Sequence, residues 1–177
     1  MTSERSAIEK LMPLAISAVV IVADRISKTS IQHSINLFDS VSVLPGWLRI
    51  VHTENAGAAF GLLADGNALL RTAVLVGISS LVLLFVASSL WGRGSGFTSP
   101  GSRIALSLIL GGATGNLYDR IAHGTVTDFI EVYRGTWSFP AFNVADSAIT
   151  VGTILLLIDL VRPRGKGVEE QAPLAHK

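Results

Sequence analysis

Long apolar segments separated by polar stretches set the pattern of this chain. The clearest, residues 72–92, contains no ionisable side chain, and residues 142–161 contain only Asp146 and Asp159. A helix crosses about 30 Å of hydrocarbon with about 20 mostly apolar residues. The pattern predicts a mainly α membrane protein, a single integral membrane domain over 1–177 built as a four-transmembrane-helix bundle. The expected spans are about 8–26, 72–92, 102–119 and 142–161.

The first apolar segment has a second interpretation. Arg5 and Lys10 precede it, as positive residues precede the apolar part of a signal peptide. The residues Ile21-Val22-Ala23 also resemble a weak cleavage site. Because three more apolar segments follow, an uncleaved first helix is the simpler interpretation.

The segments between the expected spans differ in character. In residues 27–71, apolar and polar residues alternate over 41–44 and 48–51, which predicts strands. Residues 120–141 are rich in apolar and aromatic side chains, which is typical of a loop or helix lying in the membrane interface. The bundle is therefore expected to carry a small β-containing extracytoplasmic subdomain and an interfacial loop or helix. Residues 162–177 are expected to form a flexible cytoplasmic tail.

Composition narrows the class of protein. Apolar residues make up 49% of the chain and charged residues 15%, with a mean hydropathy of +0.52, which excludes a disordered chain. A net charge of +1 gives no basic footprint for nucleic acid. The absence of cysteine excludes disulfides, thiol nucleophiles and cysteine-ligated zinc. What remains is a small membrane protein without covalent cross-links.

The distribution of Lys and Arg predicts the orientation in the membrane. With four spans, both termini lie on the same side. That side carries eight Lys and Arg residues and the opposite side carries six, and the side richer in basic residues faces the cytoplasm. We therefore expect both termini in the cytoplasm, with residues 27–71 and 120–141 on the outer side.

Several acidic residues fall where the expected spans meet the outer interface. An ionisable group at membrane depth costs at least about 2.5 kcal/mol, so its presence needs a reason. Asp24, Asp119 and Asp146 lie near the outer ends of three spans, and Asp128 lies in the last outer segment. These carboxyl groups are thus expected to gather at one level, the outer boundary of the bilayer.

Structural roles compete with functional ones for the charged residues. Asp24 and Lys28 have the i,i+4 spacing of a helix-stabilising ion pair. Asp119 and Arg120 are also consistent with residues that mark the water boundary, or with partners of each other. Asp146 is the hardest of these residues to explain by a purely structural role, because it lies inside the last expected span.

Other polar and small residues also have structural explanations. Gly111 and Gly115 form a G-x-x-x-G, which is typical of close helix packing. Asn55 to Gly57 is consistent with an ordinary turn, and Asp159 is expected to face water or to pair with Arg162. The four histidines lack metal-ligand spacing, so no metal is expected.

Two neighbouring carboxylates at the outer interface would offer one specific chemistry. Because both cannot ionise cheaply, one keeps a proton. The charged one then activates a water molecule and the protonated one polarises a carbonyl, as in aspartic proteases. Asp128 and Asp146 are a candidate pair, one in the last outer segment and one just inside the next helix. The spacing alone does not show that they meet.

Five motifs, taken in order, make the chain similar to a known family. They are Asp24-Arg25-Ile26-Ser27-Lys28 (D-x-x-x-K), Asn55-Ala56-Gly57-Ala58-Ala59-Phe60-Gly61 (N-x-G-x-A-F-G), Gly111-Gly112-Ala113-Thr114-Gly115-Asn116-Leu117-Tyr118-Asp119-Arg120 (G-G-x-x-G-N-x-x-D-R), Val126-Thr127-Asp128-Phe129 (V-x-D-F) and Phe142-Asn143-Val144-Ala145-Asp146 (F-N-x-A-D). With these motifs the chain resembles the lipoprotein signal peptidases (signal peptidase II), which are aspartic endopeptidases of the bacterial inner membrane.

The resemblance implies an activity and a set of site residues. It implies that Asp128 and Asp146 are catalytic and that the enzyme cuts prolipoproteins before a cysteine bearing diacylglycerol, within the membrane lipid. It implies no cofactor, and a monomer suffices. Tyr118 and Thr127 depart from the usual residues of the family. The candidates for binding substrate or supporting the two aspartates are Asp24, Lys28, Asn55, Gly57, Asn116, Arg120 and Asn143.

Two other function classes remain to be compared. A small proton-coupled transporter would use Asp146 as a relay, but it predicts acidic residues near mid-membrane and short loops. A non-enzymatic membrane adaptor would use the G-x-x-x-G as a dimer face, but it leaves the interfacial aspartates unexplained.

Overall fold

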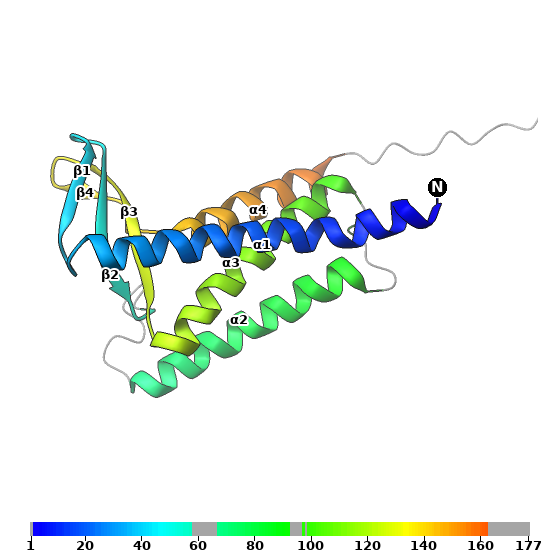
Figure 1. Ribbon diagram of the computed structural model, residues 1–177, viewed down its shortest axis with the longest axis horizontal. Coiled ribbons are helices and arrows are strands. Elements are labelled where there is room, and N and C mark those ends of the chain that lie inside the picture. Colours follow the sequence, from blue (N-terminus) through cyan, green and yellow to red (C-terminus); the bar gives the residue numbers. More distant parts are fainter. Residues whose placement is uncertain (1, 58–66, 93–96, 98, 163–177) are drawn as a thin grey trace, which may run out of the picture.

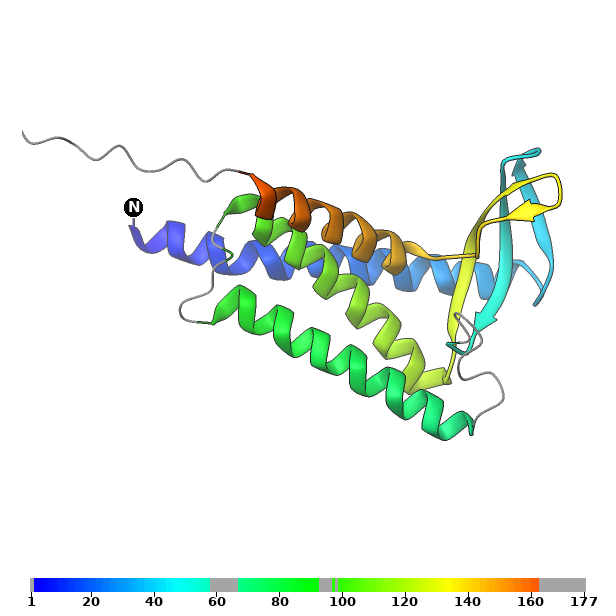
Figure 2. The same cartoon turned by 180° about the vertical axis from the view of Figure 1, so that it is seen from behind.

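The computed structural model describes residues 2–57, 67–92, 97 and 99–162. Four helices run roughly along the long axis, and a sheet covers one end of them (Figure 1). The start of α1 and the end of α4 lie together at the opposite end (Figure 2). The elements are α1 (Thr2–Ser34), β1 (Ser40–Leu44), β2 (Leu48–Asn55), α2 (Ala68–Trp91), α3 (Pro100–His123), β3 (Val126–Arg134), β4 (Trp137–Ser138) and α4 (Val144–Val161).

The expectation of a mainly α fold with a small β subdomain is confirmed. The strands form one antiparallel sheet in the order β1-β2-β3-β4. The two strands expected from alternation over 41–44 and 48–51 are β1 and β2. Of the expected tail, only residue 162 is described, and residues 58–61 of the second motif also lie outside the described residues.

The expectation of a loop or helix over residues 120–141 was wrong. The last turn of α3 reaches His123, and β3 then pairs with β2 along most of its length. The first four residues of β3 are all buried. The apolar side chains at the start of this segment therefore belong to a strand whose first residues are buried. Aromatic content alone does not distinguish such a strand from an interfacial loop.

Two of the described helices, α2 and α4, are long and apolar enough to cross a membrane. The other two helices carry more polar side chains, among them Asp24 and Lys28 of α1 and Asp119 of α3, which are buried within the structure. Length and composition therefore identify two apolar spans, and the count of four is not established by them.

Glycines bring α3 close to α1 and α4. A Cβ at Gly111 would lie 2.9 Å from the Ser17 carbonyl oxygen of α1. A Cβ at Gly115 would lie 2.7 Å from the Asp24 carboxylate of the same helix. The close packing expected from the G-x-x-x-G spacing is confirmed. On the α4 side, Gly112 faces the Ala145 carbonyl oxygen, where a Cβ would lie at 2.4 Å.

We expect Gly112→Ala to destabilise the bundle. Alanine has a higher helix propensity than glycine by about 1 kcal/mol, but the new methyl group would press on backbone of α4, and such overpacking costs about 1–3 kcal/mol. The matched control is Gly77→Ala in α2, where a Cβ would meet nothing within 4 Å. Thermal unfolding in detergent should show a lower midpoint for Gly112→Ala and an equal or higher midpoint for Gly77→Ala. Equal midpoints for the two variants would contradict this packing.

The far end of the bundle is closed by a polar contact and an apolar cluster. Asp159 of α4 accepts hydrogen bonds from the hydroxyls of Ser99 and Ser102 at the start of α3. Asp159 was expected to face water or to pair with Arg162. It is half-buried and lines a cavity together with Arg162, and the two hydroxyl contacts are partners that the sequence did not predict. The buried apolar residues beside this end are Val86, Leu90, Leu106 and Ile109.

Candidate active site

The sheet brings Asp128 to the start of α4. Backbone N–H groups of Phe129 and Ile130 donate to the Phe142 carbonyl oxygen, and the Phe142 N–H donates back to Ile130. Phe142 stands two residues before α4, so these hydrogen bonds hold β3 against the helix that carries Asp146. This bridge between Ile130 and Phe142 brings the segments of the two carboxylates together, which the sequence spacing left open.

Asn143 connects the two carboxylates. Its side-chain Nδ2 donates to Asp128 Oδ1 at 2.7 Å, and its backbone N–H donates to Asp146 Oδ2 at 3.2 Å. Its Oδ1 accepts from the Asp146 backbone N–H at 2.9 Å, which makes Asn143 the N-cap of α4. The residue is fully buried. One side chain thus caps the helix and fixes both carboxylates relative to each other.

Two more asparagines complete the hydrogen bonding of the carboxylates. Asn55 at the end of β2 donates through Nδ2 to Asp128 Oδ2 at 3.0 Å. Asn116 of α3 donates through Nδ2 to Asp146 Oδ1 at 2.7 Å. Each of the four carboxylate oxygens therefore receives one N–H, and none of the three amides offers its oxygen to the pair. Donors of this kind stabilise negative charge on a carboxylate.

Gly57 has a local role in holding Asn55. Its φ is +88°, a conformation that glycine adopts readily, and its backbone N–H donates to Asn55 Oδ1 at 2.8 Å. A Cβ here would also lie 2.1 Å from Leu75 of α2. The expected turn at Asn55 to Gly57 is therefore present, and it fixes the side chain that contacts Asp128.

Lys28 lies behind the carboxylates in a buried cluster of charges. Its Nζ donates to Asp24 Oδ2 at 2.7 Å, to Asp119 Oδ2 at 2.6 Å and to Asn116 Oδ1 at 3.0 Å. The expected Asp24–Lys28 pair is confirmed. Asp24 Oδ1 also accepts from the Ala145 N–H at 2.9 Å. The cluster therefore joins α1, α3 and the first turn of α4 directly behind the site.

The ion pair between Asp119 and Arg120 that the sequence allowed is not formed. Asp119 is buried, with Lys28 and Arg25 as its ion-pair partners. The Arg120 guanidinium instead donates to the Asn116 carbonyl oxygen at 3.4 Å. Arg120 lines a cavity of about 250 Å³ together with Asn116 and Asp146, so its charge faces the site.

Burial raises the pKa of Asp128 to about 6, and the neighbouring charge of Asp146 acts in the same direction. Hydrogen bonds from Asn55 and Asn143 oppose the increase, as does the charge of Lys28. The side chain is only 3% exposed, so desolvation dominates. A carboxyl group with this pKa exchanges a proton near neutral pH, which suits acid–base chemistry.

This pKa predicts a pH-dependent stability difference between the parent and Asp128→Asn. The pKa of Asp128 in the folded state lies above the ordinary value of 3.8, so the folded protein binds this proton more tightly than the unfolded chain. The protonated carboxyl therefore contributes to the free energy of unfolding below pH 3.8, and this contribution is lost as the pH rises through about 6. The expected loss is about 3 kcal/mol. Unfolding midpoints measured from pH 4 to pH 7 should fall more steeply for the parent than for Asp128→Asn. A difference that stays constant over this range would contradict a raised pKa.

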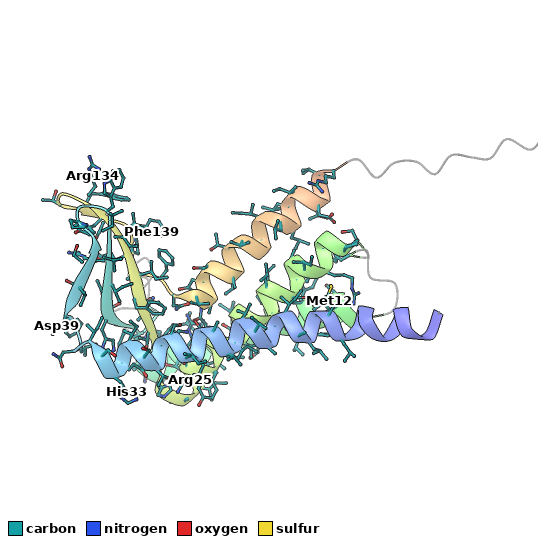
Figure 3. All side chains as sticks on the ribbon, turned by 45° about the horizontal axis from the view of Figure 1, so that its top comes forward. Met12, Arg25, His33, Asp39, Arg134 and Phe139 are labelled. Carbon is teal, nitrogen blue, oxygen red and sulfur yellow. The ribbon has the colours of Figure 1, made fainter. Side chains whose placement is uncertain are left out.

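Two cavities meet at Asp128. One of about 560 Å³ lies between the sheet and α4, and Phe139 lies on the side of the sheet that faces α4 (Figure 3). The other, of about 710 Å³, runs over the sheet and includes Arg49 and Glu131, which form an ion pair. The residues that line both cavities are Asn55, Asp128, Pro140 and Ala141.

The structure adds supporting residues that the sequence did not single out. The Thr127 hydroxyl donates to Glu54 Oε1 at 2.8 Å and accepts from Gln32 Nε2 at 2.7 Å. Glu54 also accepts from the Thr125 hydroxyl at 2.6 Å. These contacts fix the residue next to Asp128 against β2 and the last turn of α1. The polar Thr127, noted only as a departure from the usual residues of the family, is the sequence signal that could have led to them.

Within the described part of the chain, no group of three or more His, Asp or Glu side chains is arranged to hold a metal ion. The seven candidate residues other than Asp128 and Asp146 fall into three sets around these two aspartates. Asn55, Asn116 and Asn143 contact the two aspartates, Asp24 and Lys28 lie behind Asn116, and Gly57 and Arg120 flank the amides.

Comparison with known proteins gives a consistent result. The chain is 43% identical over 149 residues to a lipoprotein signal peptidase of Solibacter usitatus, which covers 84% of this chain and 90% of the relative. It is 40% identical over 157 residues to a lipoprotein signal peptidase of Pseudomonas aeruginosa, which covers 87% of this chain and 90% of the relative.

A solved structure described as a bacterial membrane enzyme, at 1.9 Å resolution, matches with a TM-score of 0.75 and 30% identity. It covers 85% of this chain and 93% of the solved one. The profile of the family described as Signal peptidase (SPase) II matches residues 16–162. Because the match spans every motif and both aspartates, this chain belongs to the signal peptidase II family of bacterial membrane peptidases.

Proposed function

We propose that this protein is an aspartic endopeptidase that removes signal peptides from diacylglyceryl-modified prolipoproteins by cutting the bond before the lipidated cysteine. The observation that carries the proposal is the joint hydrogen bonding of Asp128 and Asp146 to Asn143 beside a cavity of about 560 Å³. The family and the names of its members support the activity. They do not support the transporter considered from the sequence.

In the proposed mechanism, Asp128 and Asp146 share one proton and bind one water molecule. The ionised carboxylate takes a proton from the water as its oxygen adds to the scissile carbonyl carbon, and the protonated carboxyl polarises that carbonyl. The leaving nitrogen then takes a proton from the pair and the C–N bond breaks. The products are the carboxylate of the signal peptide and the free amino group of the lipidated cysteine.

The raised pKa of Asp128 supports a mechanism in which the pair holds one proton and passes it on during the reaction. A carboxyl with a pKa of about 6 holds a proton more readily than an exposed aspartate and still releases it near neutral pH. The N–H groups on all four carboxylate oxygens fix the pair in one geometry before substrate arrives. Such preorganised donors lower the cost of the charge that develops during the reaction.

The proposal includes an orientation and an assembly state. Four helices cross the bacterial cytoplasmic membrane, both termini are cytoplasmic, and the sheet and the two aspartates lie at the outer face. Support comes from the position of the sheet at the end opposite to the start of α1 and the end of α4 (Figures 1 and 2). The lipid tails of the substrate then stay in the outer leaflet while the peptide reaches the carboxylates. A monomer contains the whole site, and no nucleic acid takes part.

A pair of substrates tests the proposed specificity. Purified protein in detergent is given one prolipoprotein, with and without the diacylglyceryl group on its cysteine. We expect cleavage of the lipidated form, seen as a shift on a gel, and at least about a hundredfold slower cleavage of the other, because remote binding energy that positions the peptide is lost. Equal cleavage of both forms would exclude the lipid requirement, and cleavage of neither by folded protein would exclude the proposed activity.

A further inference from the structure

Lys28 is a buried cation that the proposed mechanism does not use. Its side chain is almost completely buried, and it lies on α1, outside the pair of reacting carboxylates. A buried charge of this kind is costly unless it is fully paired. The three hydrogen atoms of the ammonium group are matched by three acceptors, one each on Asp24, Asp119 and Asn116.

The contact with Asn116 fixes which way its amide points. An ammonium group only donates hydrogen bonds, so the atom of Asn116 at 3.0 Å from Lys28 Nζ must be the carbonyl oxygen. A second donor, Asn143 Nδ2 at 3.4 Å, faces the same oxygen. The NH₂ group of Asn116 is therefore left to point at Asp146 Oδ1, at 2.7 Å.

Asn116 differs from the other two asparagines in how it is oriented. The amide oxygen of Asn55 accepts from the backbone N–H of Gly57, and that of Asn143 accepts from the backbone N–H of Asp146. Both donors are close in sequence to the asparagine that they orient. Asn116 instead depends on a side chain 88 residues away on another helix. Removing Lys28 takes away the nearer of the two donors to this oxygen and leaves only the 3.4 Å contact from Asn143 Nδ2. We expect the less firmly held amide to turn and to present its oxygen to Asp146, which would repel the carboxylate.

The geometry points to Lys28 as a positioning residue for the reaction: it locks the Asn116 amide so that this amide donates a hydrogen bond to the Asp146 carboxylate. The inference rests on the proposed function of the two aspartates. Lys28 makes no hydrogen bond to either reacting carboxylate, so its hydrogen-bonded route to the pair runs through Asn116. Its charge also lowers the pKa of Asp128 directly, and the cycle with Asn116→Ala below separates the two effects. The same ammonium also holds Asp24 and Asp119 together, which gives it a structural role that a test must separate from the positioning role.

Other charged groups surround this relay and enter the design of the test. Lys28 faces Asp24 on its own helix and Asp119 on α3, and Arg25 pairs with the far oxygen of Asp119. Arg120 lines the cavity that Asn116 and Asp146 also line. Asp128 faces Asp146 across Asn143.

A double-mutant cycle of Lys28→Met and Asn116→Ala tests the inference, with cleavage of a diacylglyceryl-modified prolipoprotein measured from pH 4 to pH 9. Each single variant should lower kcat by about ten- to a hundredfold, as expected for a lost hydrogen bond to a charged group. Each should also move the acid limb of the pH–rate profile up by about one unit. The double variant should show little further change, because both substitutions remove the same donor.

A charge-matched pair covers the case in which Lys28→Met does not fold. Lys28→Met together with Asp119→Asn removes one positive and one negative charge, so the net charge of the cluster is kept. Its control is Asp119→Asn alone, which lowers stability but leaves the Lys28–Asn116 contact. We expect the acid limb to move up in the double substitution and not in the control.

Each outcome of these measurements decides the inference. A merely structural Lys28 would lower the amount of folded enzyme and leave the acid limb in place, or it would give effects that multiply with those of Asn116→Ala. Either result overturns the positioning role while the parent still cuts its substrate. If the folded parent does not cut the lipidated prolipoprotein at all, the proposed function fails instead.

Discussion

Replacing Asp128 or Asp146 with asparagine is expected to lower kcat by about 10³- to 10⁴-fold, because either change removes half of the shared proton system. Asparagine keeps the size of the side chain and loses its charge and its proton. Since the two residues act as one unit, the double variant should be no slower than the worse of the two single variants. Single-turnover cleavage of a lipidated prolipoprotein measures all three.

The control for this series is Asp39→Asn. Asp39 is exposed, receives a hydrogen bond from Asn36 and lies at the outer side of the sheet (Figure 3). Asp39→Asn makes the same chemical change, a carboxylate to an amide, at a residue that contacts neither Asp128 nor Asp146. Activity should therefore remain within about twofold of the parent. Comparable losses for Asp39→Asn and Asp128→Asn would mean that the assay reports folding or substrate access rather than chemistry.

Asn143 carries the second large expectation, because one buried side chain serves both carboxylates and the helix. Asn143→Asp keeps the shape and the helix cap but replaces the donor to Asp128 Oδ1 with an acceptor. We expect kcat to fall by about 10²- to 10³-fold, because a third carboxylate beside the pair repels its charge and removes a charge-assisted hydrogen bond. Enzyme kinetics together with thermal unfolding measure the two effects separately.

Two further substitutions separate the role of Asn143 in catalysis from its role in folding. Asn143→Ser retains a good N-cap but does not carry a donor to Asp128, so activity should fall while stability stays within about 1 kcal/mol of the parent. Asn143→Ala loses both the helix cap and the donor to Asp128, so it should also unfold at a lower temperature than the parent. Full activity in the folded serine variant would show that the Asn143 donor to Asp128 is dispensable.

The helices and two of the strands are readable from the sequence because they follow from local pattern. The charge-free run 72–92 and the alternation over 41–44 and 48–51 correspond to α2, β1 and β2. Residues 126–134 form a strand where an interfacial loop or helix was expected. Their alternation of apolar and polar side chains is interrupted at the buried end, and aromatic content does not separate a strand from an interfacial loop. Pairing with β2 and with Phe142 is a tertiary effect that overrides the local pattern.

The candidate site was identified only in part from spacing. The i,i+4 rule found the Asp24–Lys28 pair, but it says nothing about Asp119 and Asn116, which lie 91 and 88 residues from Lys28. The chemistry of two carboxylates suggested Asp128 and Asp146, and the family motifs placed the three asparagines near them. The direction of each amide was beyond the sequence, because it depends on which donor faces each oxygen in three dimensions.

The most direct test of the central claim, that Asp128 and Asp146 together carry out signal-peptide cleavage, is mass spectrometry of the reaction products. A diacylglyceryl-modified prolipoprotein is incubated with the purified parent and, in parallel, with the folded Asp128→Asn/Asp146→Asn variant. We expect the parent to release a protein beginning at the lipidated cysteine and the variant to release none over the same time. Formation of that product by the double variant at a rate comparable to the parent would contradict the account.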